Sequence, residues 1–364
     1  MKKDTCYKIE SLAYPVYVGT ELNQEMGDVL QSFFRTGRIF ILDDTNTHKY
    51  CLPVLVKYLP GMAHQPVFSI LPGEPSKNPA ILESIWRWLL ESGADRDSIL
   101  INLGGGVVSD LGGFAAASFK RGIRYINVPT SLIGQADAAI GGKTGINVAG
   151  IKNQAGFFYD PAAVFIMTEF LKTLPEDHLR SGYAEIIKCA ILSGNGYWEK
   201  VKKGSIHDHD QLFSLVHDTA GFKARTVAAD PYDHSLRKIL NFGHTAGHAL
   251  ESLPGVNGEE FMLHGEAVAA GMICESYLSY KTAGLSKDGL EEITDTIKSA
   301  FNLKPVEPCL FNQLLKLMEH DKKKTLKGTG FTLLENPGHP LIDRNVDRED
   351  IIASLEYLNQ VSQT

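Results

Sequence analysis

The segment Ser98-Ile99-Leu100-Ile101-Asn102-Leu103-Gly104-Gly105-Gly106 reveals the architecture of the first half of the chain. Its first six residues are nearly all apolar, as in a strand that is buried on both faces of a parallel sheet. The three glycines let backbone N–H groups approach a phosphate closely, and the helix expected after them adds a partial positive charge at its N-terminus. The spacing is not Gly-x-Gly-x-x-Gly, so a tight structural turn is the alternative to a nucleotide-binding loop. Asp110, in the first turn of that helix, either complements the helix dipole or binds a ribose hydroxyl.

Strand-like and helix-like segments alternate around this segment. Strands are predicted at 15–18, 38–42 and 67–70, helices at 21–34 and 79–91, and a polar loop at 43–46. Such alternation is typical of a mostly parallel sheet with helices on both faces, in which ligands bind at the carboxyl ends of the strands. The first half is therefore predicted to be a Rossmann-like, nucleotide-binding α/β domain.

A glycine-rich polar segment at 135–156 is predicted to be a long loop. It carries Asp137, Lys143, Lys152 and Asn153. Long loops in compact domains usually have a function, and the cations of this one suit an anionic substrate. A solvated loop with incidental charges is the alternative.

From about Leu171 onward, the apolar residues recur at helical spacing. Helices are predicted at 180–192, 211–228, 236–253, 265–283, 287–300 and 311–318, and a terminal strand at 330–334. The second half is therefore predicted to be an α-helical domain. A chain of 364 residues is too long for a single hydrophobic core. We therefore expect an N-terminal domain of residues 1–172 and a C-terminal domain of residues 173–364.

Three histidines of the helical half are candidates for metal binding. His244 and His248 are four residues apart, so both imidazoles lie on one face of a helix, and His264 opens the next helical run. With Glu185 as a carboxylate, this set suits a catalytic zinc site, which binds His and Asp or Glu and keeps one position open. A bare His-x-x-x-His is a weak signal, and two histidines that merely cap or decorate a helix are the alternative.

The composition excludes several classes of protein. Hydrophobic residues make up 43% and charged residues 22% of the chain, as in an ordinary globular protein. The net charge is −7 and the longest basic run is 322–324, which argues against nucleic acid as a main partner. No apolar stretch is long enough to span a membrane, and no signal core is visible, so we expect a cytoplasmic protein. Five scattered cysteines support neither a disulfide framework nor a zinc ribbon.

Nine short motifs resemble those of the 3-dehydroquinate synthase family and occur in the same order. They are G-G-G-V-V-x-D, R-G-I-R, V-P-T-S-L, D-A-x-I-G-G-K-T-G-I-N, K-N-Q-A-G-F-F-Y, G-Y-A-E-I-I-K, L-N-F-G-H-T-A-G-H-A-L-E, H-G-E-A-V-A-A-G-M and D-K-K, over roughly residues 40 to 340. The resemblance implies conversion of 3-deoxy-D-arabino-heptulosonate 7-phosphate to 3-dehydroquinate and phosphate, the second step of the shikimate pathway. It also implies NAD and a divalent metal, zinc or cobalt, as cofactors, and a homodimer.

The resemblance assigns a role to individual residues. It places the metal ligands at Glu185, His244 and His264. Around NAD it places Asp44, Asn46, Glu74, Lys77, Gly105, Gly106, Asp110, Thr130, Ser131, Lys143 and Lys152. Around the substrate it places Arg121, Asp137, Lys143, Lys152, Asn153, Lys188, Lys223, Arg237, Asn241 and His248, with Lys322 or Lys323 on the phosphate. Ser109 stands where the family usually has glycine, which affects the local shape of the loop.

Three other functions are considered beside this one. A related sugar-phosphate cyclase would act on another sugar phosphate, and Lys223, Arg237 and Asn241, which suit a carboxylate, argue against substrates without one. An NAD- and metal-dependent polyol dehydrogenase would release NADH stoichiometrically. A protein without catalytic activity would lack a catalytic side chain, and none of those implied is missing.

Overall fold

The computed structural model describes residues 6–36, 38–254, 261–321 and 330–363, and its chain divides into two compact units. The first unit comprises Met1–Leu179 and Val216–Tyr232, and the second comprises Arg180–Leu215 and Asp233–Thr364. Helix α8 (His209–Ala229) contributes to both, because its first residues group with the second unit and the rest with the first. The boundary expected at residue 172 stays a prediction.

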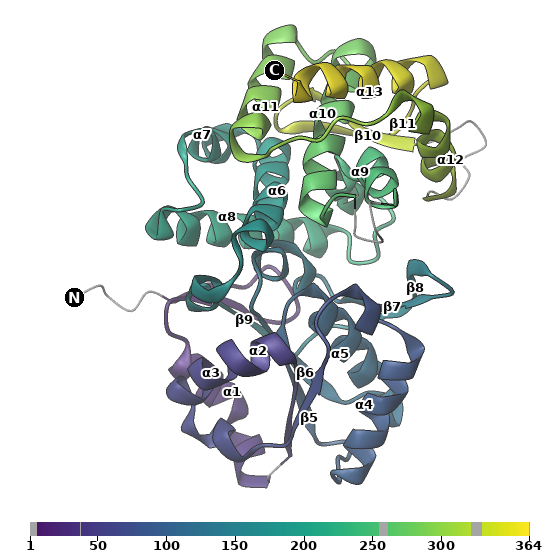
Figure 1. Ribbon diagram of the computed structural model, residues 1–364. Coiled ribbons are helices and arrows are strands. Elements are labelled where there is room, and N and C mark those ends of the chain that lie inside the picture. Colours follow the sequence, from purple (N-terminus) through teal and green to yellow (C-terminus); the bar gives the residue numbers. More distant parts are fainter. Residues whose placement is uncertain (1–5, 37, 255–260, 322–329, 364) are drawn as a thin grey trace. The chain divides into compact units, whose positions relative to one another are not determined.

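A seven-stranded sheet forms the centre of the first unit (Figure 1). Its order is β1-β2-β9-β6-β5-β3-β4, and every pair is parallel except β1 with β2. The strands are β1 (Cys6–Ile9), β2 (Val16–Gly19), β3 (Ile39–Asp44), β4 (Val67–Ile70), β5 (Ile99–Gly104), β6 (Arg124–Pro129) and β9 (Ala163–Met167). The predicted, mostly parallel α/β architecture is confirmed.

Helices cover both faces of this sheet, with α1 (Asn23–Thr36) and α3 (Leu52–Tyr58) on one face and α4 (Pro79–Glu91) and α5 (Gly106–Ser118) on the other (Figure 1). Successive residues of a strand point to opposite faces. Accordingly, Ile39 and Ile41 of β3 pack on the α1 side, whereas Phe40 and Leu42 pack on the α4 side. A strand buried on both faces must be apolar throughout, which is why the pattern was readable in the sequence.

The loop predicted at 43–46 is wrong. Strand β3 continues to Asp44, and helix α2 (Thr45–Tyr50) begins at the next residue. Asp44 Oδ1 accepts hydrogen bonds from the backbone N–H groups of Asn46 (2.8 Å) and Thr47 (3.0 Å). Aspartate satisfies the first N–H groups of a helix in this way, so the polar residues mark a helix start.

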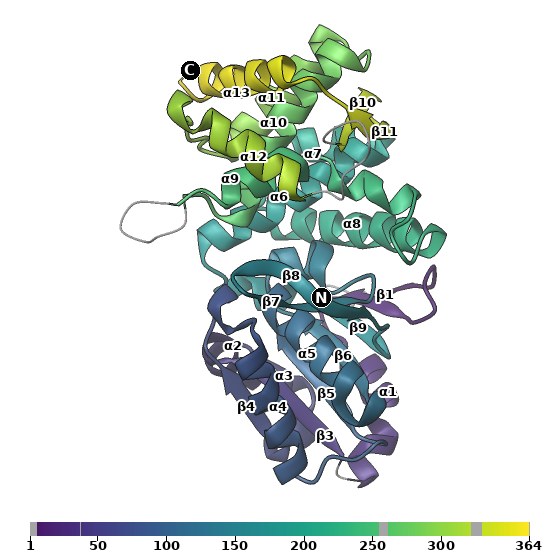
Figure 2. The ribbon, with the colours of Figure 1, turned by 90° about the vertical axis from the view of Figure 1, so that its right-hand side faces the viewer.

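The long loop predicted at 135–156 is also wrong. A π-helical turn, η4 (Gly134–Ala138), is followed by an antiparallel hairpin of β7 (Lys143–Val148) and β8 (Ile151–Phe158), which lies against α5 (Figure 2). Ala149 and Gly150 have φ of 53° and 79°, the left-handed values of a two-residue hairpin turn. The glycines serve strand pairing, since a Cβ on Gly156 would stand 1.8 Å from the carbonyl oxygen of Thr144.

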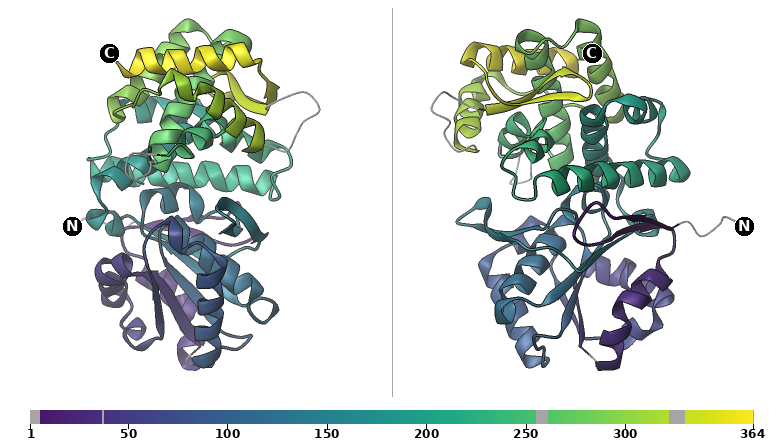
Figure 3. Two further views of the ribbon diagram at one scale, coloured as in Figure 1. Left: turned by 45° about the vertical axis from the view of Figure 1, so that its right-hand side comes forward. Right: turned by 180° about the vertical axis from the view of Figure 1, so that it is seen from behind.

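The second unit is mainly helical, as predicted. Its helices are α6 (Glu176–Ser193), which starts in the first unit, α7 (Asn195–Lys203), α9 (His244–Glu251), α10 (His264–Thr282), α11 (Lys287–Ala300), α12 (Phe311–Asp321) and α13 (Arg348–Ser362). The strand predicted at 330–334 is β10 (Gly330–Asn336), but it is not terminal, because β11 (His339–Asn345) pairs with it and α13 follows. Both β10 and α13, in yellow, pack on α10 (Figure 3).

The single helix predicted at 236–253 is wrong. A short 3-10 helix, η6 (Leu236–Asn241), is separated from α9 by Gly243, which has φ of 79°. A Cβ at Gly243 would stand 2.5 Å from Met272 Cγ and 3.0 Å from the carbonyl oxygen of Val268, so both the conformation and the space require glycine. The break makes His244 the first residue of its helix. Over the described residues, none of the helices has the length and apolar character needed to cross a bilayer.

Candidate active site

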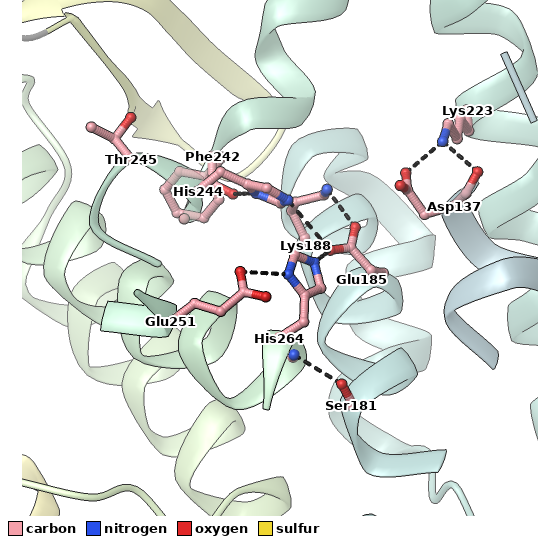
Figure 4. A network of polar contacts seen from close by, with 12 residues as sticks. Asp137, Ser181, Glu185, Lys188, Lys223, Phe242, His244, Thr245, Glu251 and His264 are labelled. Atoms are coloured by element: carbon pink, nitrogen blue, oxygen red, sulfur yellow. Dashed lines mark hydrogen bonds and ion pairs between the residues drawn. The ribbon is translucent and has the colours of Figure 1, made fainter. Parts of the chain in front are cut away.

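Three side chains of the second unit form a candidate metal centre. Glu185 projects from α6, while His244 and His264 are the first residues of α9 and α10. One possible ligand atom of each lies within 4.8 Å of the other two. The imidazole Nε2 atoms of His244 and His264 lie 3.5 Å and 3.6 Å from Glu185 Oε1, and both rings point toward that carboxylate (Figure 4).

The second nitrogen of each imidazole, Nδ1, contacts an oxygen atom of the protein. His244 Nδ1 lies 3.2 Å from the carbonyl oxygen of Phe242, and His264 Nδ1 lies 3.1 Å from Glu251 Oε2. A carbonyl oxygen only accepts, so Nδ1 of His244 carries the hydrogen and Nε2 keeps its lone pair. This is the arrangement that a metal-binding histidine adopts, with one nitrogen held by the protein and the other directed at the ion.

The charges around the centre favour an ionised Glu185. Burial acts to raise the pKa of this carboxyl group, but the ammonium group of Lys188 and the two histidines hold the pKa well below its usual range. Lys188 lies one turn away on α6, forms an ion pair with Glu185, and is itself only 1% exposed. A buried, ionised carboxylate is a strong ligand for a cation.

The donor set fits a divalent metal. One carboxylate and two imidazoles are the ligand types that zinc takes in catalytic sites, where three protein ligands leave a position for water or substrate. Within the described residues, a second group of possible ligands overlaps the first and consists of His248, Glu251 and His264. Because Glu251 contacts Nδ1 of His264, it holds the ring from the side opposite the metal.

The predicted NAD-binding residues of the first unit lie mostly at the carboxyl edge of the sheet. Asp44 ends β3, Gly105 and Gly106 link β5 to α5, and Thr130 and Ser131 follow β6. Glu74 and Lys77 follow β4, in and after the short helix η2 (Glu74–Ser76). Gly105 is the N-cap of α5 and has no side chain with which to cap the first N–H groups of this helix, which suits the approach of an anion. The edge therefore fits a dinucleotide.

A network of polar side chains joins this edge to the β7–β8 hairpin. Lys77 Nζ donates to Asp110 Oδ2 and Asn153 Oδ1, both at 2.5 Å, and Asn147 donates to Glu74 Oε1 at 2.7 Å. Burial raises the pKa of Asp110, and the charge of Lys77 opposes this. The expected place of Asp110 in the first turn of the helix is wrong, because the first turn of α5 holds no acidic residue. Its carboxylate forms an ion pair with Lys77.

A second charged pair of the first unit joins Asp137 on η4 to Lys223 on α8. Lys223 Nζ donates to Asp137 Oδ1 (2.6 Å) and to its backbone oxygen (2.5 Å), and Lys223 is 4% exposed. In the second unit, Arg237 is equally buried on η6, Asn241 ends η6, and the ring of His248 lies 5.1 Å from that of His244. His248 therefore belongs to the histidine cluster.

The remaining predicted residues differ in where they lie. Arg121 closes the short helix after α5 and precedes β6, so it lies at the amino edge of the sheet, opposite Gly105 and Thr130. Asn46 is exposed, and the Asp44 carboxylate is engaged in capping α2. Lys143 and Lys152 are exposed on the hairpin strands. Lys322 and Lys323 lie outside the described residues.

Two carboxylates near the metal centre were missed in the sequence. Glu251 follows His244 by seven residues and His248 by three, so helical spacing already puts it on their face. Glu275 is fully buried on α10 and accepts hydrogen bonds from backbone N–H groups at the start of α9. In the sequence, Glu275 is marked only by its charge among the small and apolar residues of α10.

Solved structures with the same fold include two synthases that have NAD+ and a divalent metal bound. A 2-deoxy-scyllo-inosose synthase complexed with carbaglucose-6-phosphate, NAD+ and Co2+ is 21% identical, with a TM-score of 0.85 over 97% of this chain and 99% of that one. The 2-epi-5-epi-valiolone synthase of Streptomyces hygroscopicus, with NAD+ and Zn2+ bound, is 24% identical, with a TM-score of 0.83 over 97% and 98%. At these identities the similarity establishes the fold.

Sequence comparison establishes the family. Residues 67–181 match the model of the 3-dehydroquinate synthase N-terminal region, and residues 182–324 match that of the C-terminal region. The 3-dehydroquinate synthase of Parabacteroides distasonis is 42% identical over 95% of this chain and 98% of its own length. That of Acinetobacter baylyi is 37% identical over 96% and 97%. The chain therefore belongs to the 3-dehydroquinate synthase family.

Proposed function

We propose that this protein is a 3-dehydroquinate synthase that converts 3-deoxy-D-arabino-heptulosonate 7-phosphate to 3-dehydroquinate and phosphate. The observation that carries the proposal is the convergence of Glu185, His244 and His264, in a chain that aligns with relatives of this name over nearly its full length. When bound, the metal would acidify a sugar hydroxyl, and NAD would accept a hydride at C5 and return it after phosphate has left. The net reaction is a phosphate elimination with ring closure and no net redox change.

The residues of the second unit would hold the metal and orient the sugar. Glu185, His244 and His264 would bind the ion, and the ion pair with Lys188 keeps Glu185 ionised. The planar guanidinium group of Arg237 suits the two oxygens of a carboxylate. His248 lies beside His244, and the family resemblance implies that it would lie by the phosphate end of the substrate.

The residues of the first unit would hold NAD and further charges. The start of α5 at Gly105 and Gly106 would receive the pyrophosphate, since backbone N–H groups and the helix dipole both favour an anion there. Lys143 and Lys152, exposed on the hairpin, would supply cations for phosphate, and cations near a leaving phosphate stabilise its developing charge. An ion pair with the partly exposed Asp137 holds the buried Lys223 in place.

A comparison of substrates tests the proposal. Phosphate release is measured with NAD and zinc for three compounds: 3-deoxy-D-arabino-heptulosonate 7-phosphate, a heptulose 7-phosphate without a carboxylate, and glucose 6-phosphate. We expect turnover of the first compound alone, because Arg237 and Lys223 suit a carboxylate. Turnover of either of the others, with none of the first, would identify a different sugar-phosphate cyclase. The expected homodimer and cytoplasmic location are also proposals, to be tested by light scattering and cell fractionation.

A further inference from the structure

Helices α9 and α10, which begin with the two histidine ligands, cross with their backbones in direct contact. A Cβ on Gly271 would stand 2.0 Å from the carbonyl oxygen of Gly243, and one on Gly247 would stand 3.0 Å from that of Ala267. Glycine at the crossing therefore lets the two helices approach without intervening side chains. At such close range, one carboxylate on either helix can reach the ligand region of the other.

Glu251, near the end of α9, reaches the first residue of α10. Its Oε2 accepts a hydrogen bond from Nδ1 of His264 at 3.1 Å, and its side chain is 10% exposed. This bond fixes the rotation of the imidazole ring and leaves Nε2 as the nitrogen that faces Glu185, 3.6 Å away. The contact runs from α9 to a ligand on α10.

Glu275, on α10, makes the reverse contact to the start of α9. Its Oε2 accepts from the backbone N–H of Gly243 (2.7 Å), and its Oε1 accepts from those of Thr245 (3.0 Å) and Ala246 (3.2 Å). In the sequence, His244 stands between Gly243 and Thr245. Gly243, the N-cap of α9, has no side chain with which to cap the helix, so a buried carboxylate of the neighbouring helix takes that place.

We propose that Glu251 and Glu275 are positioning residues that set the geometry of the metal centre before the ion binds. Each is carried by one helix and holds the histidine region of the other, so that His244 and His264 keep a fixed separation and a fixed ring orientation. Outer carboxylates that orient histidine ligands typically raise metal affinity about 10–100-fold. The inference rests on the metal site of the proposed function, and it assigns to that site two residues that bind neither the ion nor the substrate.

Zinc affinity, measured by competition with a chromogenic chelator on the NAD-free protein, tests the proposal. We expect Glu251→Ala to weaken zinc binding about 10–100-fold. Glu251→Gln should recover part of this loss, because its amide oxygen still accepts from Nδ1–H of His264. Glu275→Gln should weaken zinc binding about tenfold or more, because an NH₂ group then faces backbone N–H groups. The visible absorption bands of the Co2+-loaded protein should shift in the same variants, since they report ligand geometry.

Ser279→Ala is the matched control, because it also removes a buried polar group from α10. Ser279 is fully buried one turn beyond Glu275, and its Oγ bonds to the Glu275 backbone oxygen (2.6 Å) and the Leu334 N–H (2.9 Å), away from α9. The Ser279→Ala substitution should lower the Tm of the chelator-treated protein without changing its zinc affinity. If Glu275→Gln does not fold, Glu275→Asp, which keeps the charge but shortens its reach, replaces it with the same expectation.

Glu185→Ala separates failure of this inference from failure of the metal site. If Glu185→Ala binds zinc as tightly as the unaltered protein, the ion does not occupy the proposed centre and both conclusions fall. If Glu185→Ala loses zinc while the Glu251 and Glu275 variants keep full affinity, the positioning roles alone are wrong. Two zinc ions per chain would also overturn the inference, since Glu251 would then be a ligand together with His248.

Discussion

His244 and His264 present the same imidazole group in two different electrostatic environments. Burial and the nearby charge of Lys188 hold the pKa of His244 well below its usual range. Burial acts in the same direction on His264, but hydrogen bonds to Glu185 and Glu251 outweigh it and raise the pKa of His264 to about 10. At neutral pH the metal-free centre therefore has one imidazole ready to bind an ion and one that must first release a proton.

Asp43 is a buried carboxylate whose contribution to stability should depend on pH. Its side chain is fully buried, with Ser69 Oγ at 2.6 Å from Oδ1 and His48 Nδ1 at 2.9 Å from Oδ2, and Asp44 is its neighbour. Burial raises the pKa of Asp43, and the bonds to Ser69 and His48 only partly oppose this. A carboxyl group with a raised pKa in the folded state stabilises the fold most below its ordinary pKa. That contribution is lost as pH rises through the folded-state value.

Asp43→Asn should remove this dependence. We expect the Tm of the Asp43→Asn variant, relative to that of the unaltered protein, to improve as pH rises from about 4 to about 7. Over this range the unaltered protein must bury an ionised carboxylate, whereas the variant has none. Thermal unfolding at several pH values measures the difference, with Asp97→Asn, an aspartate with a 78% exposed side chain, as the control. A difference in Tm that stays constant, or that falls with pH, would contradict the explanation.

At the scale of single elements, glycine decides how the two ligand helices meet. Gly271 faces the backbone of Gly243 across the α9–α10 crossing, where an added Cβ would stand 2.0 Å from a carbonyl oxygen. Backbone atoms cannot rotate away as a side chain can, so the helices would have to separate. A helical glycine with space around it behaves differently. At Gly27, on α1, a Cβ would meet only Leu59 Cδ2 at an ordinary 3.8 Å.

Gly271→Ala and Gly27→Ala should therefore have opposite effects. We expect Gly271→Ala to destabilise the protein by about 1–3 kcal/mol, as overpacking of a core does, and to weaken zinc binding by moving His244 away from His264. Gly27→Ala should stabilise it by about 0.5–1 kcal/mol, because alanine favours the helix. Urea unfolding of the metal-free variants measures both. Equal effects of the two substitutions would show that the crossing is not as tight as described.

The sequence predicted best those elements whose pattern follows from burial alone. Amphipathic spacing placed α4 at Pro79–Glu91 and α11 at Lys287–Ala300 with their observed bounds, and the apolar run before Gly104 gave the central strand. The predictions of local structure were wrong where glycine is compatible with two kinds of structure. The glycines of 135–156 are typical of a loop but here allow close strand pairing, while Gly243 interrupts an otherwise regular helical pattern.

For the site, the family motifs supplied three candidate metal ligands, and the structure brings all three together. The contact between Glu275 and the start of α9 joins residues about 30 positions apart and depends on the backbone approach at Gly271, which no local pattern records. The position of Arg121 at the far edge of the sheet likewise follows from the direction of α5 between β5 and β6.

At the scale of the whole molecule, metal and nucleotide are assigned to different compact units. The three proposed metal ligands lie in α6, α9 and α10 of the second unit, whereas Gly105, Gly106 and Lys77, which are proposed to bind NAD, belong to the first. A ligand that binds only the folded form stabilises what it contacts, by about 2.7 kcal/mol at a concentration 100 times its Kd. Each ligand should therefore protect its own unit first.

Hydrogen exchange followed by mass spectrometry tests this division. We expect zinc to slow exchange most strongly in peptides from α9 and α10, and NAD to slow it most strongly around Gly104–Gly106 and the β7–β8 hairpin. Protection by zinc that is largest in the sheet of the first unit would contradict the assignment of the metal to Glu185, His244 and His264. Glu185→Gln supplies the matched control, since zinc should then protect neither unit.

The most direct test of a synthase that uses NAD without consuming it is the number of product molecules formed per NAD. Enzyme with one equivalent of NAD and zinc is mixed with excess 3-deoxy-D-arabino-heptulosonate 7-phosphate, and phosphate, 3-dehydroquinate and the absorbance of NADH at about 340 nm are recorded together. We predict many equivalents of phosphate and 3-dehydroquinate per NAD, in equal amounts, with no accumulation of NADH. One equivalent of oxidised product per NAD, with matching NADH and no phosphate, would show instead a dehydrogenase.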